Sequence, residues 1–261
     1  MFGKLGLGLG LSRARGGGAK PALETANLLF SIDPSRANSL FYKADAESEY
    51  LPCVANGDIV SGRERVNKIV CGGIDGTTFN LITPTLTAAL NVAKDANGKL
   101  YLNNSTASAK WGYTVDGGAE ANIGGDASTN IYAVTTYKTI GTNDYTLFLS
   151  KGAFGVVAQW NGDYSLTNCS FANKVEGVLS VCGIYFETYD STAYFGIKNQ
   201  DEQSIVGKSF VSFPSNIFGG TANGSYYIAK IYGLQVYNVA GLTVTQAKAI
   251  NKKAMDYYGI S

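Results

Sequence analysis

The pattern of hydrophobic and polar positions is clearest at the C-terminal end of the chain. The run from Tyr226 to Tyr237 is long, aromatic and β-branched, which predicts a strand. Neither face of this run is strongly polar, so we expect both faces to be at least partly covered. After a turn at 238–241, apolar residues recur at helical spacing, which predicts an amphipathic helix over 243–258.

The predicted helix carries its own start and stop signals. Thr243 followed by Gln246 is a capping-box pattern, and Gly259 is a natural left-handed stop. One helical face is apolar except for Asn251, and we expect it to pack on the rest of the domain. The apolar residues of this face are Val244, Ala247, Ile250, Ala254, Met255 and Tyr258.

Short strands separated by turn residues are predicted over the rest of the chain. From about residue 106 the turns recur at a spacing typical of a β-sandwich. The segment 86–93 fits either a helix or a buried strand, and Asn97-Gly98 marks a hairpin turn. The predicted strands are 28–32, 40–42, 66–71, 101–103, 110–115, 131–140, 145–150, 156–160, 177–187, 193–198 and 209–213.

The C-terminal pattern resembles that of a known fold family. In Ile228–Ile260 a hydrophobic strand is followed by a helix that ends in Tyr258-Gly259. This order is similar to the last core strand and short helix of concanavalin A-like, or laminin G-like, jelly-roll modules. The resemblance implies an all-β fold, an antiparallel jelly-roll β-sandwich with one C-terminal α-helix. It implies little about function, because that fold serves lectins, hydrolases and structural proteins alike.

Residues 1–21 differ from the rest of the chain. Four leucines alternate with glycines, so an extended backbone would place all four on one side. Because glycine-rich segments are costly to order alone, the segment is either a disordered tail or an assembly arm that a neighbour orders. We expect an extended N-terminal arm over 1–21, followed by one domain over 22–261. The arm residues are Leu5, Leu7, Leu9, Leu11, Arg13 and Arg15.

Charge and hydropathy exclude several partners. The chain has 21 Lys and Arg against 20 Asp and Glu, so no long-range field recruits nucleic acid or a membrane. No apolar run reaches the roughly 20 residues of a membrane span. The apolar stretch at 5–11 is half glycine and is followed by arginines, which is wrong for a signal peptide. We therefore expect a protein made and used without classical secretion.

The residues most used in catalysis and metal binding are missing or scattered. There is no histidine, which removes the commonest general base and metal ligand. The cysteines lack C-x-x-C spacing, so buried free thiols are favoured over a zinc site or two disulfides. We therefore expect no metal site and no cofactor. The four cysteines are Cys53, Cys71, Cys169 and Cys182.

A glycoside hydrolase needs two carboxylates held across the scissile bond. The chain has no E-x-D-x-x-E type motif, and the acid pairs Glu187 with Asp190 and Asp201 with Glu202 are typical of solvated surface. We therefore expect no catalytic residue.

One aromatic and polar cluster indicates a glycan site. Trp160, Asn161, Asp163 and Tyr164 combine an aromatic platform with amide and carboxylate partners at the end of a predicted strand. Trp111 with Tyr113 is a second candidate. The competing interpretation is a core tryptophan followed by an ordinary turn.

Two non-enzymatic functions remain. A glycine- and leucine-rich arm ahead of a low-charge jelly roll resembles structural proteins of tailed-phage virions, in tail, fibre or capsid-decorating positions. This resemblance implies virion localisation, other virion proteins as partners, a homo-oligomer or symmetric array, and contact with host surface glycans. The alternative is a free carbohydrate-binding, lectin-like module or adhesin, with a glycoside hydrolase third.

Overall fold

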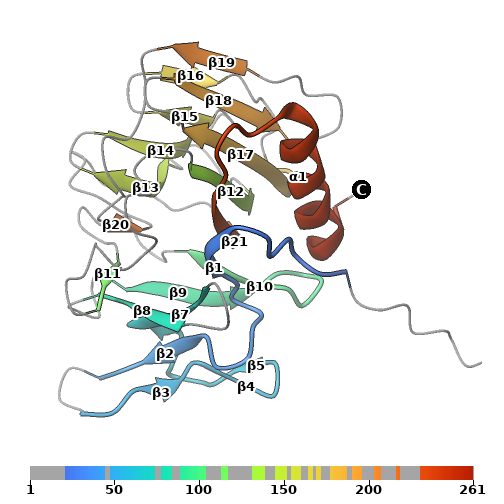
Figure 1. The fold of residues 1–261 in the computed structure, drawn as a ribbon. Helices are drawn as coiled ribbons and strands as arrows, with labels where there is room; N and C mark the ends of the chain where they lie inside the picture. The colour runs from blue at the N-terminus through green and yellow to red at the C-terminus, as the bar shows by residue number, and fades with distance from the viewer. Residues whose placement is uncertain are drawn as a thin grey trace, which may run out of the picture.

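The fold was analysed in a computed structural model. It describes residues 21–44, 48–73, 78–83, 89–103, 113–116, 131–138, 145–151, 154–159, 164–166, 169–171, 177–186, 190–195, 203–206, 216–217 and 230–260. Within these residues the chain is an antiparallel jelly-roll β-sandwich with one C-terminal α-helix (Figure 1), which confirms the predicted fold class. Residues 1–20 of the arm lie outside the described residues, so the division into arm and domain stays a prediction.

Most of the described strands belong to one curled sheet. Its main path runs β11 (Thr114–Val115), β8 (Thr78–Ile82), β7 (Lys68–Gly73), β1 (Leu28–Ile32), β21 (Lys230–Asn238), β12 (Ile131–Lys138), β17 (Ser180–Phe186), β18 (Asp190–Phe195) and β19 (Gln203–Val206). Branches from this path are β10 (Leu100–Asn103), β9 (Leu90–Lys94), β6 (Arg65–Val66), β2 (Leu40–Tyr42) and β3 (Leu51–Pro52).

A second sheet and a hairpin complete the β structure of the described residues. The second sheet runs β16 (Cys169–Phe171), β15 (Tyr164–Leu166), β14 (Phe154–Gln159), β13 (Tyr145–Lys151) and β20 (Asn216–Ile217). The hairpin consists of β4 (Val54–Ala55) and β5 (Asp58–Ile59). In Figure 1, α1 (Val244–Tyr258) flanks the β12–β17–β18 part of the large sheet, and β13 and β14 lie on the other side.

Strand β21 is the centre of the large sheet. It pairs along its whole length with β12 on one side, and with both β1 and β10 on the other. Residues 231–237 are all buried, which confirms that both faces of the predicted strand are covered. The first residues of that predicted strand, 226–229, lie outside the described residues.

Alternate residues of β12 face two different hydrophobic cores, as the period of two in a strand requires. Ile131 and Ala133 belong to the main core, which also contains Phe30 and Ile69. Tyr132 and Val134 belong to a second core together with the buried residues of α1. The helix therefore closes a face of the sheet that would otherwise expose a large apolar area.

The helix begins and ends where the sequence predicts. The side-chain hydroxyl of Thr243 accepts a hydrogen bond from the amide of Gln246, and the Gln246 side chain accepts one from the amide of Thr243. Gly259 has a φ of 65°, the left-handed conformation that glycine adopts without strain. The helix packs against β12, β17 and β18.

The predicted packing face of α1 is right except at its first turn. Ala247, Ile250, Ala254 and Tyr258 are buried, as expected. Val244 was expected to pack and is instead exposed, because Leu242, just before the helix, occupies the second core beside Ala247. This is the arrangement of a hydrophobic staple.

Asn251, which interrupts the apolar face, is buried rather than solvated. Its Oδ1 accepts a hydrogen bond of 2.7 Å from the hydroxyl of Tyr132 on β12.

Each predicted strand that falls on described residues overlaps an observed strand, but the predicted ends differ and several strands were missed. The ambiguous segment 86–93 ends in a strand, β9, and Asn97-Gly98 forms the β9–β10 hairpin turn, with Gly98 at a φ of 77°. Strand β18 begins three residues before the predicted 193. Strands β3, β4, β5, β8, β15, β16, β19 and β20 were not predicted, and the predicted strand 209–213 lies outside the described residues.

The described ends of the chain meet at one small cluster. Leu23 and Ile260 both pack against the rings of Tyr101, Tyr232 and Tyr258. Nearby, the carboxylate of Glu24 forms a 2.5 Å ion pair with Lys253 of α1, and its backbone carbonyl accepts a hydrogen bond from Tyr237. This ion pair, together with the neighbouring backbone amides, lowers the pKa of Glu24 to about 2.

Replacing Ile250 by alanine tests the packing of α1. The side chain is 8% exposed, so its truncation should lower the free energy of unfolding by about 2–5 kcal/mol. Val244→Ala is the matched control on the same helix, because Val244 is 37% exposed, and it should change that free energy by no more than about 0.5 kcal/mol. Urea denaturation measures both variants, and equal effects would contradict the packing described here.

Candidate functional site

A groove lies between the C-terminal end of α1 and three turns of the chain. It consists of two adjoining cavities, of about 330 and 430 Å³, which share Ser35, Gly57 and Leu100. We call it the helix-end groove. Its first cavity is also lined by Gly98, Lys99, Tyr232, Tyr257 and Tyr258, and its second by Arg36, Ala37, Asn38, Pro52, Val54, Ala55 and Asn56.

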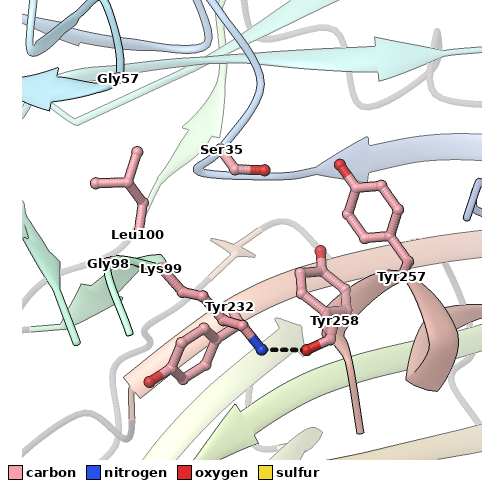
Figure 2. A pocket seen from close by; sticks show the side chains of 8 residues that line it. All are labelled: Ser35, Gly57, Gly98, Lys99, Leu100, Tyr232, Tyr257 and Tyr258. Carbon is pink, nitrogen blue, oxygen red and sulfur yellow. Dashed lines mark hydrogen bonds between the residues drawn. The ribbon is translucent and has the colours of Figure 1, made fainter. Parts of the chain in front are cut away.

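Tyrosines from α1 and β21 form one wall of the first cavity (Figure 2). Tyr257 and Tyr258 are consecutive on the helix, so Tyr258 points into the sheet while the Tyr257 ring stays half-buried at the groove. Their rings meet edge to face at 4.9 Å. Gly233 of β21 makes this approach feasible, because a Cβ there would overlap the Tyr258 hydroxyl. The glycine thus sets how closely the helix end approaches the sheet.

Asp33 ties the end of α1 to the turn after β1. One carboxylate oxygen accepts hydrogen bonds from the amide and the hydroxyl of Ser35, at 2.9 and 2.7 Å. The other accepts a 2.5 Å hydrogen bond from the hydroxyl of Tyr257. Figure 2 shows this hydroxyl pointing toward Ser35. A single buried carboxylate therefore fixes groove residues from two segments at opposite ends of the chain.

Asp95 has the same role in the β9–β10 turn. Its Oδ1 accepts hydrogen bonds from the amides of Asn97 and Lys99, at 2.8 and 2.9 Å, and its Oδ2 accepts one from Tyr232 at 3.1 Å. Burial acts to raise the pKa of Asp95, but the hydrogen bonds outweigh it and leave the pKa below its ordinary value. Burial and the nearby carboxylate raise the pKa of Tyr232. The Asp95 carboxylate is therefore ionised at neutral pH.

The charged residues that line the groove are cations held by backbone carbonyls. The Arg36 guanidinium donates to the carbonyl of Val70 and lies over Gly72, where a Cβ would overlap it. The Lys99 ammonium donates to the carbonyl of Tyr258 at the end of α1, the contact drawn as a dashed line in Figure 2. Both side chains are thus placed before any ligand arrives.

Of the glycan-binding residues predicted from the sequence, the structure describes Tyr164 alone. Trp160, Asn161 and Asp163 lie outside the described residues, and Tyr164 begins β15 in the second sheet. The predicted site at Trp160 therefore stays a prediction, as do the six arm residues between Leu5 and Arg15.

The second glycan candidate is part of the core. Tyr113 is wholly buried, its hydroxyl donates to the carbonyl of Val66 at 2.5 Å, and it accepts from the amide of Leu90 at 3.0 Å. The competing core interpretation is correct for this tyrosine, because its polar atom is used inside the fold. Trp111 lies outside the described residues.

The described residues contain no activated nucleophile among their buried thiols. Cys53, Cys71 and Cys182 are buried and unpaired, which confirms the free-thiol prediction for these three. Burial raises the pKa of Cys53 to about 12 and also raises that of the other two. Within the described ranges, no three metal-ligating side chains gather at one place, and no helix has the length and apolarity of a membrane span.

Sequence reasoning missed the helix-end groove because its parts are far apart in the chain. Tyr257 and its partner Asp33 are separated by 224 positions. The available signals were the turns at Asp33-Pro34, Asn56-Gly57 and Asn97-Gly98, which mark loops without showing that they converge.

Comparison with known proteins supports the fold alone. No protein-family model and no curated protein sequence matches the chain. In structure it is similar to Trypanosoma rangeli sialidase in complex with sialic acid (TM-score 0.50, 10% identity, 90% of this chain and 34% of that chain). It is likewise similar to the complex of that sialidase with 2,3-difluorosialic acid (TM-score 0.51, 11% identity, the same coverage). The chain thus spans about a third of the length of these sialidases.

A weaker likeness links the chain to the CBM40 domain of a Ruminococcus gnavus IT-sialidase. The TM-score is 0.40 and the identity 15%, over 58% of this chain and 96% of that one. This likeness is too low to carry an argument.

The charge of Asp95 should stabilise the fold in a pH-dependent way. The pKa of Asp95 in the folded state is lowered below the ordinary 3.8. The charged carboxylate therefore adds to the free energy of unfolding above pH 3.8, and this addition is lost as the pH falls through the folded-state pKa. Asp95→Asn keeps the acceptor for the turn amides but removes the charge. We expect it to lower the free energy of unfolding at neutral pH, and to do so less in acid.

Urea unfolding of wild type and Asp95→Asn across this acid range measures the difference. Asp116→Asn, at an exposed turn residue, is the control. A difference that stays constant as the pH falls would contradict the role assigned to the Asp95 charge.

Proposed function

We propose that the chain is a non-enzymatic, carbohydrate-binding β-sandwich module that holds its ligand in the helix-end groove. The observation that carries this proposal is the half-exposed ring of Tyr257 beside fixed polar groups of Ser35 and Lys99. An aromatic face suits the C–H surface of a sugar ring, and convergent polar groups suit its hydroxyls.

The size and rigidity of the groove support this proposal. Ligand pockets typically measure roughly 300–1,000 Å³, and the two adjoining cavities, at about 330 and 430 Å³, lie within this range. Its walls are fixed before binding, because Asp33 and Asp95 hold the turns on either side. A preformed site loses little conformational entropy when a ligand binds.

The structural neighbours favour carbohydrate over other small-molecule classes. The sialidases that share the fold are complexes with sialic acid and a fluorinated sialic acid. Their catalytic activity is not part of the proposal, because this chain spans about a third of their length.

The proposed function does not include hydrolysis of the glycan, because the carboxylates near the groove do not suit that reaction. A glycosidase needs one carboxyl that gives up a proton and another that attacks or activates water. Here both oxygens of Asp33 and of Asp95 accept hydrogen bonds, and the lowered pKa keeps Asp95 ionised. Asp95 is therefore not available as a general acid, and both oxygens of Asp33 are engaged inside the fold.

A second candidate function rests on the N-terminal pattern. The alternating leucines and glycines of residues 5–11 suit an arm that adds to a neighbour's sheet edge or fills an apolar groove. We therefore also propose that the module is a structural component of a tailed-phage virion, anchored by this arm in a homo-oligomer or symmetric array and contacting host surface glycans. The two proposals are compatible, since a virion sandwich can itself hold a glycan.

A glycan array with the purified full chain tests carbohydrate binding. We expect Tyr257→Ala to lower the affinity for any hit by about tenfold or more, because it removes the platform. Tyr257→Phe should lower it less, because the ring remains and only the contacts of its hydroxyl, including the one with Asp33, are lost. The bound glycans should be recovered uncleaved.

Trp160→Ala decides between the two glycan sites. Loss of binding in this variant, with Tyr257→Ala unaffected, would place the ligand at the predicted Trp160 cluster and contradict the groove. A chain that binds no glycan on the array would contradict the carbohydrate proposal itself.

Deletion of residues 2–18 tests the arm. We expect a folded, soluble sandwich that no longer joins the particle, because burial of four leucines, each contributing about 1.5–3 kcal/mol, would be lost. Circular dichroism of the purified domain is the folding control, and occupancy in assembled particles is the measurement. Normal occupancy of the truncated chain would remove the support for the virion role.

A further inference from the structure

The helix-end groove is lined by positive charge alone. Of the residues that line its two cavities, the charged ones are Arg36 and Lys99, and none is acidic. Resting on the proposed carbohydrate function, we infer that the groove selects an anionic saccharide, a uronate whose carboxylate is bound by the guanidinium of Arg36. Lys99, in the adjoining cavity, adds to the attraction.

Two acidic side chains, Asp33 and Asp95, lie near the groove, but neither lines it, so the preference for an anionic ligand remains. Each of their carboxylate oxygens already accepts a hydrogen bond from a tyrosine, serine or backbone donor. Part of their acceptor capacity is thus used inside the fold. Among the described residues, the ion pairs engage other side chains, Lys94, Lys252 and Lys253, and no carboxylate forms a salt bridge with Arg36 or Lys99.

Arg36 is prepared for a planar anion. One nitrogen of its guanidinium donates to the carbonyl of Val70, and the absence of a side chain at Gly72 leaves the space it occupies. Among the described residues its other N–H groups make no hydrogen bond, and a forked contact is the geometry in which arginine binds carboxylates most strongly. Because the side chain is already fixed, less rotamer entropy is lost on binding.

Lys99 is fixed in a similar way at the other end. Its ammonium group has three donors, of which one contacts the carbonyl of Tyr258. The remaining donors are free to meet a hydroxyl or a second acidic group of an extended saccharide. The two adjoining cavities thus suit a chain of more than one sugar residue.

A matched pair of probes tests the inference. Isothermal titration of the full chain compares a short oligogalacturonate with its fully methyl-esterified form, which has the same backbone without the charge. We expect the wild type to bind the free acid about tenfold or more tightly than the ester, and added salt to weaken only the acid. Arg36→Gln should remove this preference, so that the acid and the ester bind with similar affinity.

Two further variants keep the test decisive. Lys99→Met should weaken binding of the acid by a smaller factor, about threefold, and it carries the test if Arg36→Gln fails to fold. Lys248→Gln is the control, since it removes the same charge from the exposed face of α1 and should leave both affinities unchanged.

Each outcome has a separate meaning. Equal affinity for acid and ester would overturn the anionic preference and leave the carbohydrate function standing. No binding of either probe, together with an empty glycan array, would overturn both. Competition by inorganic sulfate as strong as that of the uronate would show a simple anion site and overturn the inference.

Discussion

The burial of both faces of β21 is the constraint on which the rest of the structure depends. A strand without a polar face must be covered on each side, and this chain meets the need with the main core on one side and α1 on the other. The helix in turn depends on Gly233, because any larger residue there would displace Tyr258. The position of the helix end, and with it the tyrosine wall of the groove, follows from how β21 is covered.

The polar groups at the groove serve structure and recognition together. Asp33 and Asp95 stabilise turns and tyrosine hydroxyls, and neither carboxylate lines the groove. Arg36 and Lys99 make their structural contacts with backbone carbonyls, and among the described residues neither forms a salt bridge with a carboxylate. A groove whose charged lining residues are both cations therefore forms in a chain whose net charge is only +1.

Local patterns in the sequence predicted the local structure well. The capping box at Thr243, the stop at Gly259 and the hydrophobic strand before them each depend on neighbours in sequence, and all three are present. The prediction that Val244 packs on the sheet was wrong, because periodicity alone cannot show that Leu242, before the helix, occupies that part of the core. The groove was beyond prediction, since contacts such as Tyr257 with Asp33 depend on the course of the whole chain.

The meeting of Leu23 and Ile260 at one cluster determines how the domain responds to force. A pull applied at Leu23 and Ile260 would first load this cluster and the contacts of α1 with the second core, and then Leu28 of β1 beside Tyr237 of β21. Because both ends of the chain leave β1 and β21 at the same end of the pair, the hydrogen bonds between these strands would break one after another and not all together. Sequential rupture needs little force, so the sandwich is a mechanically weak link when its two ends are drawn apart. Attachment through one end alone leaves the cluster unloaded and the groove intact.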